Sequence, residues 1–181
     1  MDSHRESARG LFITFEGIEG TGKTTQIEMA AQWLAARGFS CVRTREPGGC
    51  PISDQIRAIL LDAKNSGLRP DAELLLYVAA RAQHVADVVI PALESGKIVL
   101  CDRFADATEA YQGYARGLGA AFVRDLSMRF AQRIQPDLTL LLDMPADVAL
   151  TRARSRADLL AVAHKEDRFE KEALAFHAKV R

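Results

Sequence analysis

A glycine-rich stretch near the N-terminus carries the clearest chemistry in this sequence. It matches the pattern G-x-x-x-x-G-K-[ST], with Gly17, Gly22, Lys23 and Thr24 at the four fixed positions. Glycines let a backbone wrap around a phosphate chain with its N–H groups turned inward, and a following helix N-terminus adds partial positive charge. The lysine can reach the β- and γ-phosphates, and the threonine hydroxyl can bind Mg²⁺. The predicted nucleoside triphosphate site consists of Gly17, Ile18, Glu19, Gly20, Thr21, Gly22, Lys23, Thr24 and Thr25.

Charged residues also follow two other apolar segments of the chain. Arg45 comes after the run 39–44, and Asp102 and Arg103 come after the run 97–101. In open α/β sheets, ligands bind past the carboxyl ends of the strands, where these side chains are expected. A carboxylate such as Asp102 then addresses the Mg²⁺ shell, and Arg103 can hold a second anion in a bidentate grip. The alternatives are a solvated turn at Arg45 and Glu46 and a local ion pair at Asp102 and Arg103.

Two further groups of side chains have a spacing that suits a nucleotide. Tyr77 and Arg81 are four residues apart on a predicted helix, so they share a face and can stack on and hydrogen-bond to a flat heterocycle. Arg152, Arg154 and Arg156 alternate along the chain and suit a basic lid over transferring phosphates. Taken alone, the first pair is more often core plus surface, and the three arginines are more often a solvated basic face.

The elements that position these residues follow from hydrophobic patterning. Short apolar runs predict strands, and the amphipathic stretches between them predict helices. A strand, a helix and a second strand in succession form a β-α-β unit, which makes the sheet parallel. The predicted strands are 11–15, 39–44, 97–101 and 138–142. The predicted helices are 26–37, 52–62, 71–95 with a kink near Pro91, 120–134, 145–156 and 167–181, and 106–116 is helical or looped.

Length and composition limit the possible classes of protein. The 181 residues fit one domain, 11–181, preceded by a loose polar tail, 1–10. A formal net charge of zero provides no basic field for a nucleic acid or a membrane. Three cysteines without metal-site spacing favour a reduced, cytoplasmic setting. The tail lacks the apolar region of a signal peptide, and we expect no stretch to approach the length of a transmembrane helix.

The distribution of arginines narrows the reaction. No guanine-recognising N-K-x-D tetrapeptide occurs, which counts against a GTPase switch. Arginines are plentiful beyond the phosphate loop, and a kinase with a phosphorylated acceptor needs such cations to offset the repulsion between two phosphate groups. A phosphate oxygen is already ionised near neutral pH, so no strong base is needed. The sequence therefore predicts phosphoryl transfer by alignment and charge neutralisation.

The combination of these motifs resembles that of the bacterial thymidylate kinases. The resemblance implies a three-layer α/β/α parallel sheet of the P-loop NTPase fold, nucleoside monophosphate kinase type, and usually a homodimer. The implied reaction is transfer of the γ-phosphoryl group of ATP to dTMP with Mg²⁺, which gives dTDP for dTTP synthesis. The matching segments run in family order over nearly the whole chain: 15–25, 45–49, 73–81, 102–103, 110–113, 136–143 and 152–156.

The resemblance also implies which residues bind dTMP. In the family pattern, Tyr77 stands where a phenylalanine usually stacks on thymine, Arg81 contacts the base edge, and Tyr111 crowds the sugar 2′ position. Arg45 and Arg103 hold the phosphate. The full implied set is Glu19, Arg45, Pro47 after an often cis peptide bond, Tyr77, Arg81, Arg103, Thr108, Tyr111 and Gln112.

Catalytic and metal-binding residues follow from the same resemblance. Because the phosphate loop carries Gly20 where some relatives have an arginine, a lid at about 152–167 is expected to supply the catalytic cation. The implied catalytic residues are Lys23, Arg103, Arg152, Arg154 and Arg156, and the implied Mg²⁺ residues are Thr24, Asp102 and Glu19.

The sequence departs from the family pattern at several places. Cys50 replaces the usual threonine after Gly-Gly, and Ala107 stands where a serine is common. The chain ends at Arg181, whereas the resemblance implies about one more strand and helix, so we expect a truncated C-terminus with an open sheet edge.

Two other functions stay open at this point. Another small P-loop kinase, such as a deoxynucleoside kinase, would need a general base, for which Glu16, Glu19 or Asp102 are available. Phosphorylation of thymidine but not of dTMP would identify it. A non-catalytic nucleotide-binding protein would bind ATP tightly without dTMP-dependent ADP release.

Overall fold

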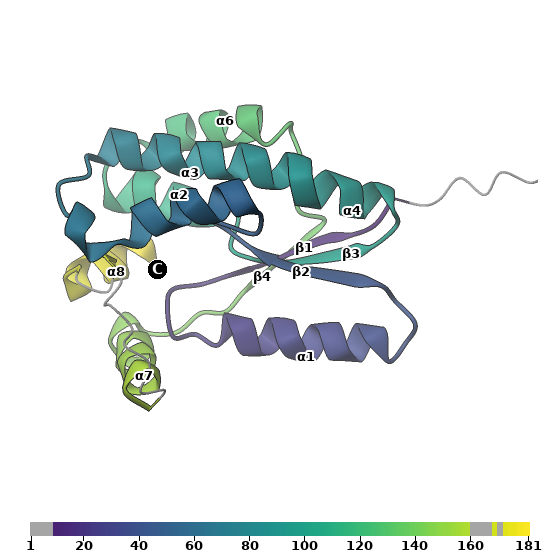
Figure 1. Ribbon diagram of the computed structural model, residues 1–181. Helices are drawn as coiled ribbons and strands as arrows, with labels where there is room; N and C mark the ends of the chain where they lie inside the picture. The colour runs from purple at the N-terminus through teal and green to yellow at the C-terminus, as the bar shows by residue number, and fades with distance from the viewer. Residues whose placement is uncertain (1–8, 160–167, 170–171) are drawn as a thin grey trace, which may run out of the picture.

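The computed structural model describes residues 9–159, 168–169 and 172–181, with the side chains of residues 154 and 156–159 outside that description (Figure 1). Most of the expected N-terminal tail and the expected lid residues 160–167 therefore lie outside the described residues. The division of the chain into a tail, a kinase domain and a lid stays a prediction.

A parallel sheet of four strands forms the centre of the described structure. In spatial order the strands are β2 (Cys41–Arg45), β3 (Ile98–Asp102), β1 (Phe12–Glu16) and β4 (Leu138–Leu141). All three pairings are parallel, as the succession of strands and helices predicts. The four predicted strands are confirmed, with ends shifted by one or two residues.

Helices cover both faces of the sheet and make three layers (Figure 1). Helix α1 (Lys23–Ala35) lies on one face. The other face is covered by a thicker layer made of α2 (Pro51–Leu61), α3 (Pro70–His84), α4 (Ile90–Glu94) and α6 (Ala120–Phe130). This arrangement confirms the expected α/β/α architecture.

Alternation along the strands divides the core between the two faces. Phe12 and Val99 pack with η2 (Val85–Val89) and α4, whereas Phe15, Ile98 and Leu100 pack against α1. Neighbouring residues of a strand point to opposite faces, so both faces of this sheet are apolar. These two clusters fix the strand ends from which the polar loops leave.

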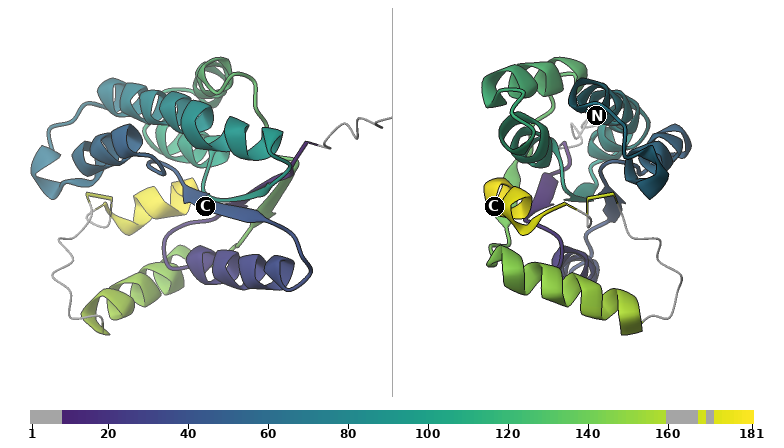
Figure 2. Two further views of the ribbon diagram at one scale, coloured as in Figure 1. Left: turned by 45° about the vertical axis from the view of Figure 1, so that its right-hand side comes forward. Right: turned by 90° about the vertical axis from the view of Figure 1, so that its left-hand side faces the viewer.

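Five further helical elements belong to the described chain. They are η1 (Ala63–Asn65), α5 (Ala105–Thr108), the π-helical η3 (Glu109–Ala115), α7 (Ala146–Leu159) and α8 (Leu174–Val180). Figure 2 shows α7 on the side of the sheet where α1 lies, and α8 beside the strand ends. The prediction of a helix over 167–181 is wrong at the described residues before Leu174, because Arg168 and Phe169 lie in a turn and Ala173 is extended.

The long helical run Pro70–Glu94 corrects one expectation. It contains a π-helical segment, η2 (Val85–Val89), directly before the turn that holds Pro91, and the kink near Pro91 stays a prediction. An 18-residue window of this 25-residue run has a mean hydropathy of 1.2, so the run is long and apolar enough to cross a membrane by length and composition alone. Core helices of soluble proteins share this property, and Glu73, Arg81 and His84 of this run are buried in polar contacts with other elements.

Candidate active site

Strand register brings the predicted site residues to one edge of the sheet. Asp102 at the end of β3 pairs with Phe15 of β1 on one side and with Arg45 of β2 on the other. The glycine-rich loop leaves β1 directly after Glu16 and enters α1 at Lys23. The carboxyl ends of the three strands therefore form one polar edge, as expected of a parallel α/β sheet.

The glycine-rich loop, which we call the P-loop (Gly17–Thr25), has close neighbours on its outer side. Gly20 has a left-handed φ of +80°, and a Cβ atom at this position would overlap the carbonyl oxygen of Ala149 in α7. Gly17, with φ of +131°, approaches the carbonyl oxygen of Leu142 in the same way. This contact with Ala149 brings α7, the helix that carries Arg152, against the P-loop.

Lys23 lies folded over the P-loop. Its Nζ atom donates hydrogen bonds to the carbonyl oxygens of Gly17 and Ile18, each at 2.9 Å, and only 7% of the residue is exposed. Burial, followed by the positive charge of Arg103, lowers the pKa of Lys23 to about 8. The ammonium group thus stays mainly charged at neutral pH, which suits an anionic ligand.

Two of the expected Mg²⁺ residues meet at this edge. The Thr24 hydroxyl donates to Asp102 Oδ2 at 3.3 Å. Magnesium usually takes one or two protein carboxylates together with substrate phosphates and water, so a hydroxyl and a carboxylate beside a phosphate loop fit this ion. Within the described ranges, no group of three or more His, Cys, Asp or Glu side chains is arranged to hold a metal on its own.

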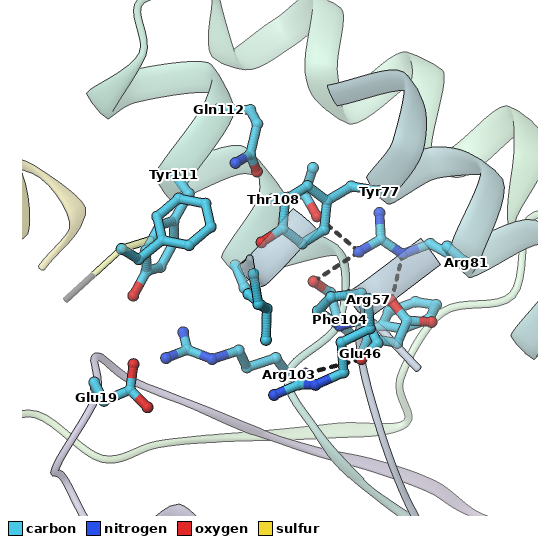
Figure 3. Close-up of a pocket in the computed structure, with 14 residues that line it drawn as sticks. Glu19, Glu46, Arg57, Tyr77, Arg81, Arg103, Phe104, Thr108, Tyr111 and Gln112 are labelled. Carbon is cyan, nitrogen blue, oxygen red and sulfur yellow. Dashed lines mark hydrogen bonds and ion pairs between the residues drawn. The ribbon is translucent and has the colours of Figure 1, made fainter. Parts of the chain in front are cut away.

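A pocket of about 560 Å³ opens beside the P-loop (Figure 3). Side chains from the P-loop, the turns after β2 and β3, the helices α2, α3, α5 and η3, and the segment before α8 meet there. Its lining consists of Glu19, Glu46, Pro47, Arg57, Leu61, Tyr77, Arg81, Arg103, Phe104, Ala107, Thr108, Tyr111, Gln112 and Phe169. Of the nine residues expected to bind dTMP, eight line this pocket, and Arg45 does not.

Arg81 is held rigidly at the base of the pocket, with 1% of its surface exposed. Its Nε donates to Glu46 Oε2 at 2.7 Å, and its Nη1 donates to Ser127 Oγ at 3.1 Å. Its Nη2 donates to the Phe104 carbonyl at 3.0 Å and to Thr108 Oγ1 at 2.7 Å. These four hydrogen bonds fix the plane of the guanidinium group. A guanidinium with a fixed plane can bind a flat ligand in one orientation.

Glu46 is the buried counterion that sequence analysis missed. It precedes Pro47 through a cis peptide bond, as the resemblance implies. Its Oε1 atom lies 2.9 Å from His84 Nδ1, and the other ring nitrogen of His84 lies 2.6 Å from Thr44 Oγ1. The chain Thr44–His84–Glu46–Arg81 joins β2 to α3 and orients the guanidinium. The Arg-Glu-Pro motif indicated an unusual turn, but it did not indicate that Glu46 would pair with Arg81.

Three aromatic rings form one side of the pocket. Phe169 packs edge-on against Tyr111 and Tyr77, with ring centroids 5.5 and 6.4 Å away. Tyr77 and Tyr111 were expected from the sequence, but Phe169 was not, because it belongs to the segment that follows the lid. Its place in the pocket depends on a long-range contact, for which spacing along the chain carries no signal.

Arg103 lies between the P-loop and the pocket. Its backbone has a left-handed φ of 69°, and its N–H donates to the Phe15 carbonyl of β1 at 3.0 Å. The guanidinium lies 5.2 Å from the centre of the Tyr111 ring and reaches toward Glu19 (Figure 3). The unusual backbone conformation turns this side chain into the site, as such conformations often do at functional positions.

Glu16 is a buried carboxyl group at the end of β1. Its Oε1 atom accepts a hydrogen bond from the Phe104 backbone N–H at 2.7 Å, and 5% of the residue is exposed. Burial raises the pKa of Glu16 to about 7, against the opposing effect of the Arg103 charge. This group therefore titrates near neutral pH, beside the reacting edge.

The two arginines near the turn after β2 differ in placement. Arg45 is exposed and forms an ion pair with Asp54 at 2.9 Å, outside the pocket lining. Arg57 of α2 lines the pocket, and its Nη1 donates to the Pro47 carbonyl at 2.9 Å. Sequence analysis missed Arg57 because it follows the turn by two helical turns, and only folding brings it back.

The expected lid arginines are described only in part. Arg152 is exposed on α7, and its Nη1 lies 3.6 Å from the sulfur of Met144. The side chains of Arg154 and Arg156 lie outside the described part of the structure, as do residues 160–167. Their catalytic role stays a prediction.

Comparison with known proteins is consistent with this geometry. The family model described as thymidylate kinase matches residues 15–181. A thymidylate kinase of Geobacter sp. (strain M21) is 59% identical over 172 residues, which are 95% of this chain and 76% of that protein. One of Syntrophotalea carbinolica is 62% identical over 171 residues, which are 94% of this chain and 79% of that protein.

A solved structure gives the same result. The crystal structure of thymidylate kinase from Ehrlichia chaffeensis superposes with a TM-score of 0.71 at 37% identity, covering 84% of this chain and 87% of that one. The match of the family model spans the P-loop, the pocket and both segments that flank the lid. This chain therefore belongs to the thymidylate kinase family.

Proposed function

We propose that this protein transfers the γ-phosphoryl group of ATP to dTMP, giving ADP and dTDP. The observation that carries this proposal is the junction of two sites: a P-loop and a separate pocket meet at one sheet edge, and Arg103 lies between them. Membership of the thymidylate kinase family supports ATP as the donor and dTMP as the acceptor.

The donor site is the P-loop. Its backbone N–H groups and the N-terminus of α1 bind the triphosphate, and Lys23 exchanges its bonds to the Gly17 and Ile18 carbonyls for phosphate oxygens. Thr24 and Asp102 would hold Mg²⁺, with Glu19 near by. When bound there, the ion would supply positive charge that offsets the negative charge of the triphosphate.

The acceptor site is the pocket of Figure 3. Tyr77 stacks on thymine, and Tyr111 crowds the sugar 2′ position. The bonds of Arg81 to other described residues use four of its five N–H groups. We assign the fifth, on Nη1, to the base edge, with Thr108 holding the guanidinium from the side.

Arg103 and Arg57 hold the acceptor phosphate from two sides of the pocket. Both line it, and both carry a guanidinium suited to bidentate phosphate binding. Arg45 contributes from outside the lining, where Asp54 competes for its guanidinium. These cations offset the repulsion between the acceptor phosphate and the triphosphate.

Transfer proceeds by alignment and charge neutralisation. An oxygen of the dTMP phosphate attacks the γ-phosphorus, ADP leaves, and no side chain needs to remove a proton from the attacking group. Contact between Gly20 and α7 supports a lid cation above the transferring group. Arg152, Arg154 and Arg156 are the candidates, and each would stabilise charge on the equatorial oxygens.

The same proposal includes a cytoplasmic homodimer. Five large apolar side chains of the described residues are exposed on the outer helical layer: Ile52 (51%) and Ile59 (47%) on α2, Leu75 (60%) on α3, and Phe122 (59%) and Phe130 (48%) on α6. Apolar side chains gathered on adjacent helices suit a symmetric interface. The zero net charge fits a protein without a nucleic acid or membrane partner.

An acceptor screen tests the proposed function. ADP release is measured with ATP and Mg²⁺ in the presence of dTMP, dUMP, dCMP or thymidine. We expect the highest kcat/KM with dTMP. Phosphorylation of thymidine without phosphorylation of dTMP would contradict the proposal, and ATP binding without ADP release for any acceptor would favour a binding protein.

A further inference from the structure

Glu73 is a buried carboxylate that the mechanism above does not use. It lies in the first turn of α3 and has 0% exposure. Its Oε2 atom lies 2.6 Å from Arg168 Nη2, an ion pair outside regular hydrogen-bond geometry, and its Oε1 lies 3.3 Å from Arg116 Nε. Two guanidinium groups therefore face this carboxylate.

One of the partners of Glu73 is a pocket residue. Gln112 Nε2 donates to Glu73 Oε1 at 2.7 Å. An ionised carboxylate only accepts hydrogen bonds, so the atom of Gln112 that faces it must be the NH₂ group. Glu73 thereby fixes which way the amide of Gln112 points.

The orientation of the amide determines where the oxygen of Gln112 lies. Gln112 lines the pocket, and its Oε1 is buried without a hydrogen-bond partner among the described residues. Figure 3 shows the amide directed toward the space beside Tyr111 and Tyr77. A buried oxygen without a partner is unfavourable, and a ligand that donates a hydrogen bond would satisfy it.

We propose that Glu73 is a positioning residue that selects the acceptor base by presenting Gln112 Oε1 as an acceptor only. The inference rests on the proposed function and names a determinant of its specificity. Thymine and uracil carry an N–H at ring position 3, whereas cytosine carries an unprotonated nitrogen there. A fixed carbonyl oxygen accepts a hydrogen bond from the N–H of thymine or uracil. In cytosine the same oxygen faces a nitrogen lone pair, which repels it.

The ion pair between Glu73 and Arg168 also connects α3 to residues that follow the lid in the chain. Arg168 also donates its Nε to the Leu60 carbonyl at 2.9 Å, and the next residue, Phe169, completes the aromatic wall. Arg116 forms a second ion pair with Glu172 at 2.6 Å. The carboxylate of Glu73 thus connects Gln112 to Arg168 through a buried ion pair, and Arg116 extends the connection to Glu172.

Replacement of Glu73 by glutamine tests the inference. The amide introduced at position 73 either donates or accepts, so Gln112 is free to turn and to donate to cytosine. We expect the ratio of kcat/KM for dTMP to that for dCMP to fall at least 10-fold in Glu73→Gln. The ratio is measured within one preparation, so it does not depend on the fraction of folded enzyme.

Two further variants separate positioning from general structural damage. In a Gln112→Met background, Glu73→Gln should change the ratio by less than about 2-fold, because the amide through which Glu73 acts is gone. Arg116→Gln removes one ion pair of Glu73 but keeps its bond to Gln112, so the ratio should stay as in the wild type. An unchanged ratio in Glu73→Gln, or an equal effect of Glu73→Gln in both backgrounds, would overturn the inference.

A swapped pair covers the case in which Glu73→Gln does not fold. Glu73→Gln combined with Gln112→Glu keeps one carboxylate and one amide in the cluster, and the carboxylate at position 112 still only accepts. This double variant should retain its preference for dTMP, and equal use of dTMP and dCMP would overturn the inference. If the wild type phosphorylates neither nucleotide, the proposed function fails, and calorimetric binding of dTMP and dCMP to the same variants still tests the role of Glu73.

Discussion

Arg81 Nε lies 2.7 Å from Glu46 Oε2, and the two side chains are 1% and 3% exposed. This buried ion pair links the turn after β2 to the last turn of α3, so the base of the pocket is built from two distant segments. Removing one partner of such a pair leaves an uncompensated buried charge. The pair therefore serves both the stability of the protein and the geometry of its acceptor site.

Glu46→Gln should lower both stability and acceptor binding. The variant keeps the shape of the side chain but removes the charge that faces Arg81, so unfolding in urea should show a loss of about 3 kcal/mol. The KM for dTMP should rise at least about 10-fold, because the guanidinium loses its fixed orientation. Glu94→Gln, at an exposed position of α4, is the control and should change stability by less than about 0.5 kcal/mol. Equal behaviour of the two variants would contradict the role of the pair.

Lys23→Ala should abolish most of the activity without unfolding the protein. The ammonium group is buried, and its lowered pKa means that folding does not gain from its charge. The transferring phosphoryl group loses a cation, so kcat should fall about 10³-fold or more. Thermal unfolding, followed by circular dichroism, should change by only a few degrees. Lys97→Ala, at an exposed position, is the control, and near-normal turnover in Lys23→Ala would refute the P-loop assignment.

Arg57→Ala should weaken dTMP binding more than Arg45→Ala does. Arg57 lines the pocket, whereas Arg45 is exposed and paired with Asp54. Loss of one charge-assisted hydrogen bond corresponds to about 1.5–3 kcal/mol, so KM for dTMP should rise about 10- to 100-fold in Arg57→Ala. Steady-state kinetics at saturating ATP measure both variants. A larger effect of Arg45→Ala would show that its guanidinium leaves Asp54 and enters the site.

Local sequence features were sufficient to predict the frame of this site. The P-loop pattern determines its own conformation, and the apolar runs before Asp102 and Arg45 bring these residues to one sheet edge through parallel pairing. The spacing of Tyr77 and Arg81 predicted a shared helix face, and both line the pocket.

The partners of these residues were not predictable in the same way. Glu46, Arg57 and Phe169 enter the pocket through contacts between segments far apart in sequence, and each would be an ordinary turn, helix or loop residue by its neighbours alone. Phe169 also lies where a continuous helix was expected, and the turn at Arg168 is stabilised by Glu73 of α3. Tertiary contacts here override the helical pattern of 167–181.

The buried carboxyl of Glu16 should make stability depend on pH. Its pKa is raised from 4.5 to about 7 in the folded protein, mainly by burial. The folded state therefore binds this proton more tightly than the unfolded state, and its contribution to stability is fully present below pH 4.5. That contribution is lost as pH rises to about 7 and stays lost at higher pH.

Glu16→Gln isolates this effect, because the amide stays neutral and its oxygen still accepts from the Phe104 N–H. Urea unfolding of the variant and the wild type should agree within about 1 kcal/mol at pH 5, and the variant should be more stable by about 1–3 kcal/mol at pH 8. Glu94→Gln changes an exposed carboxylate and is the control. Its difference in stability from the wild type should be the same at pH 5 and at pH 8. A difference between Glu16→Gln and the wild type that is the same at every pH would mean that the carboxyl does not change its charge in this range, and that Arg103 keeps Glu16 ionised throughout.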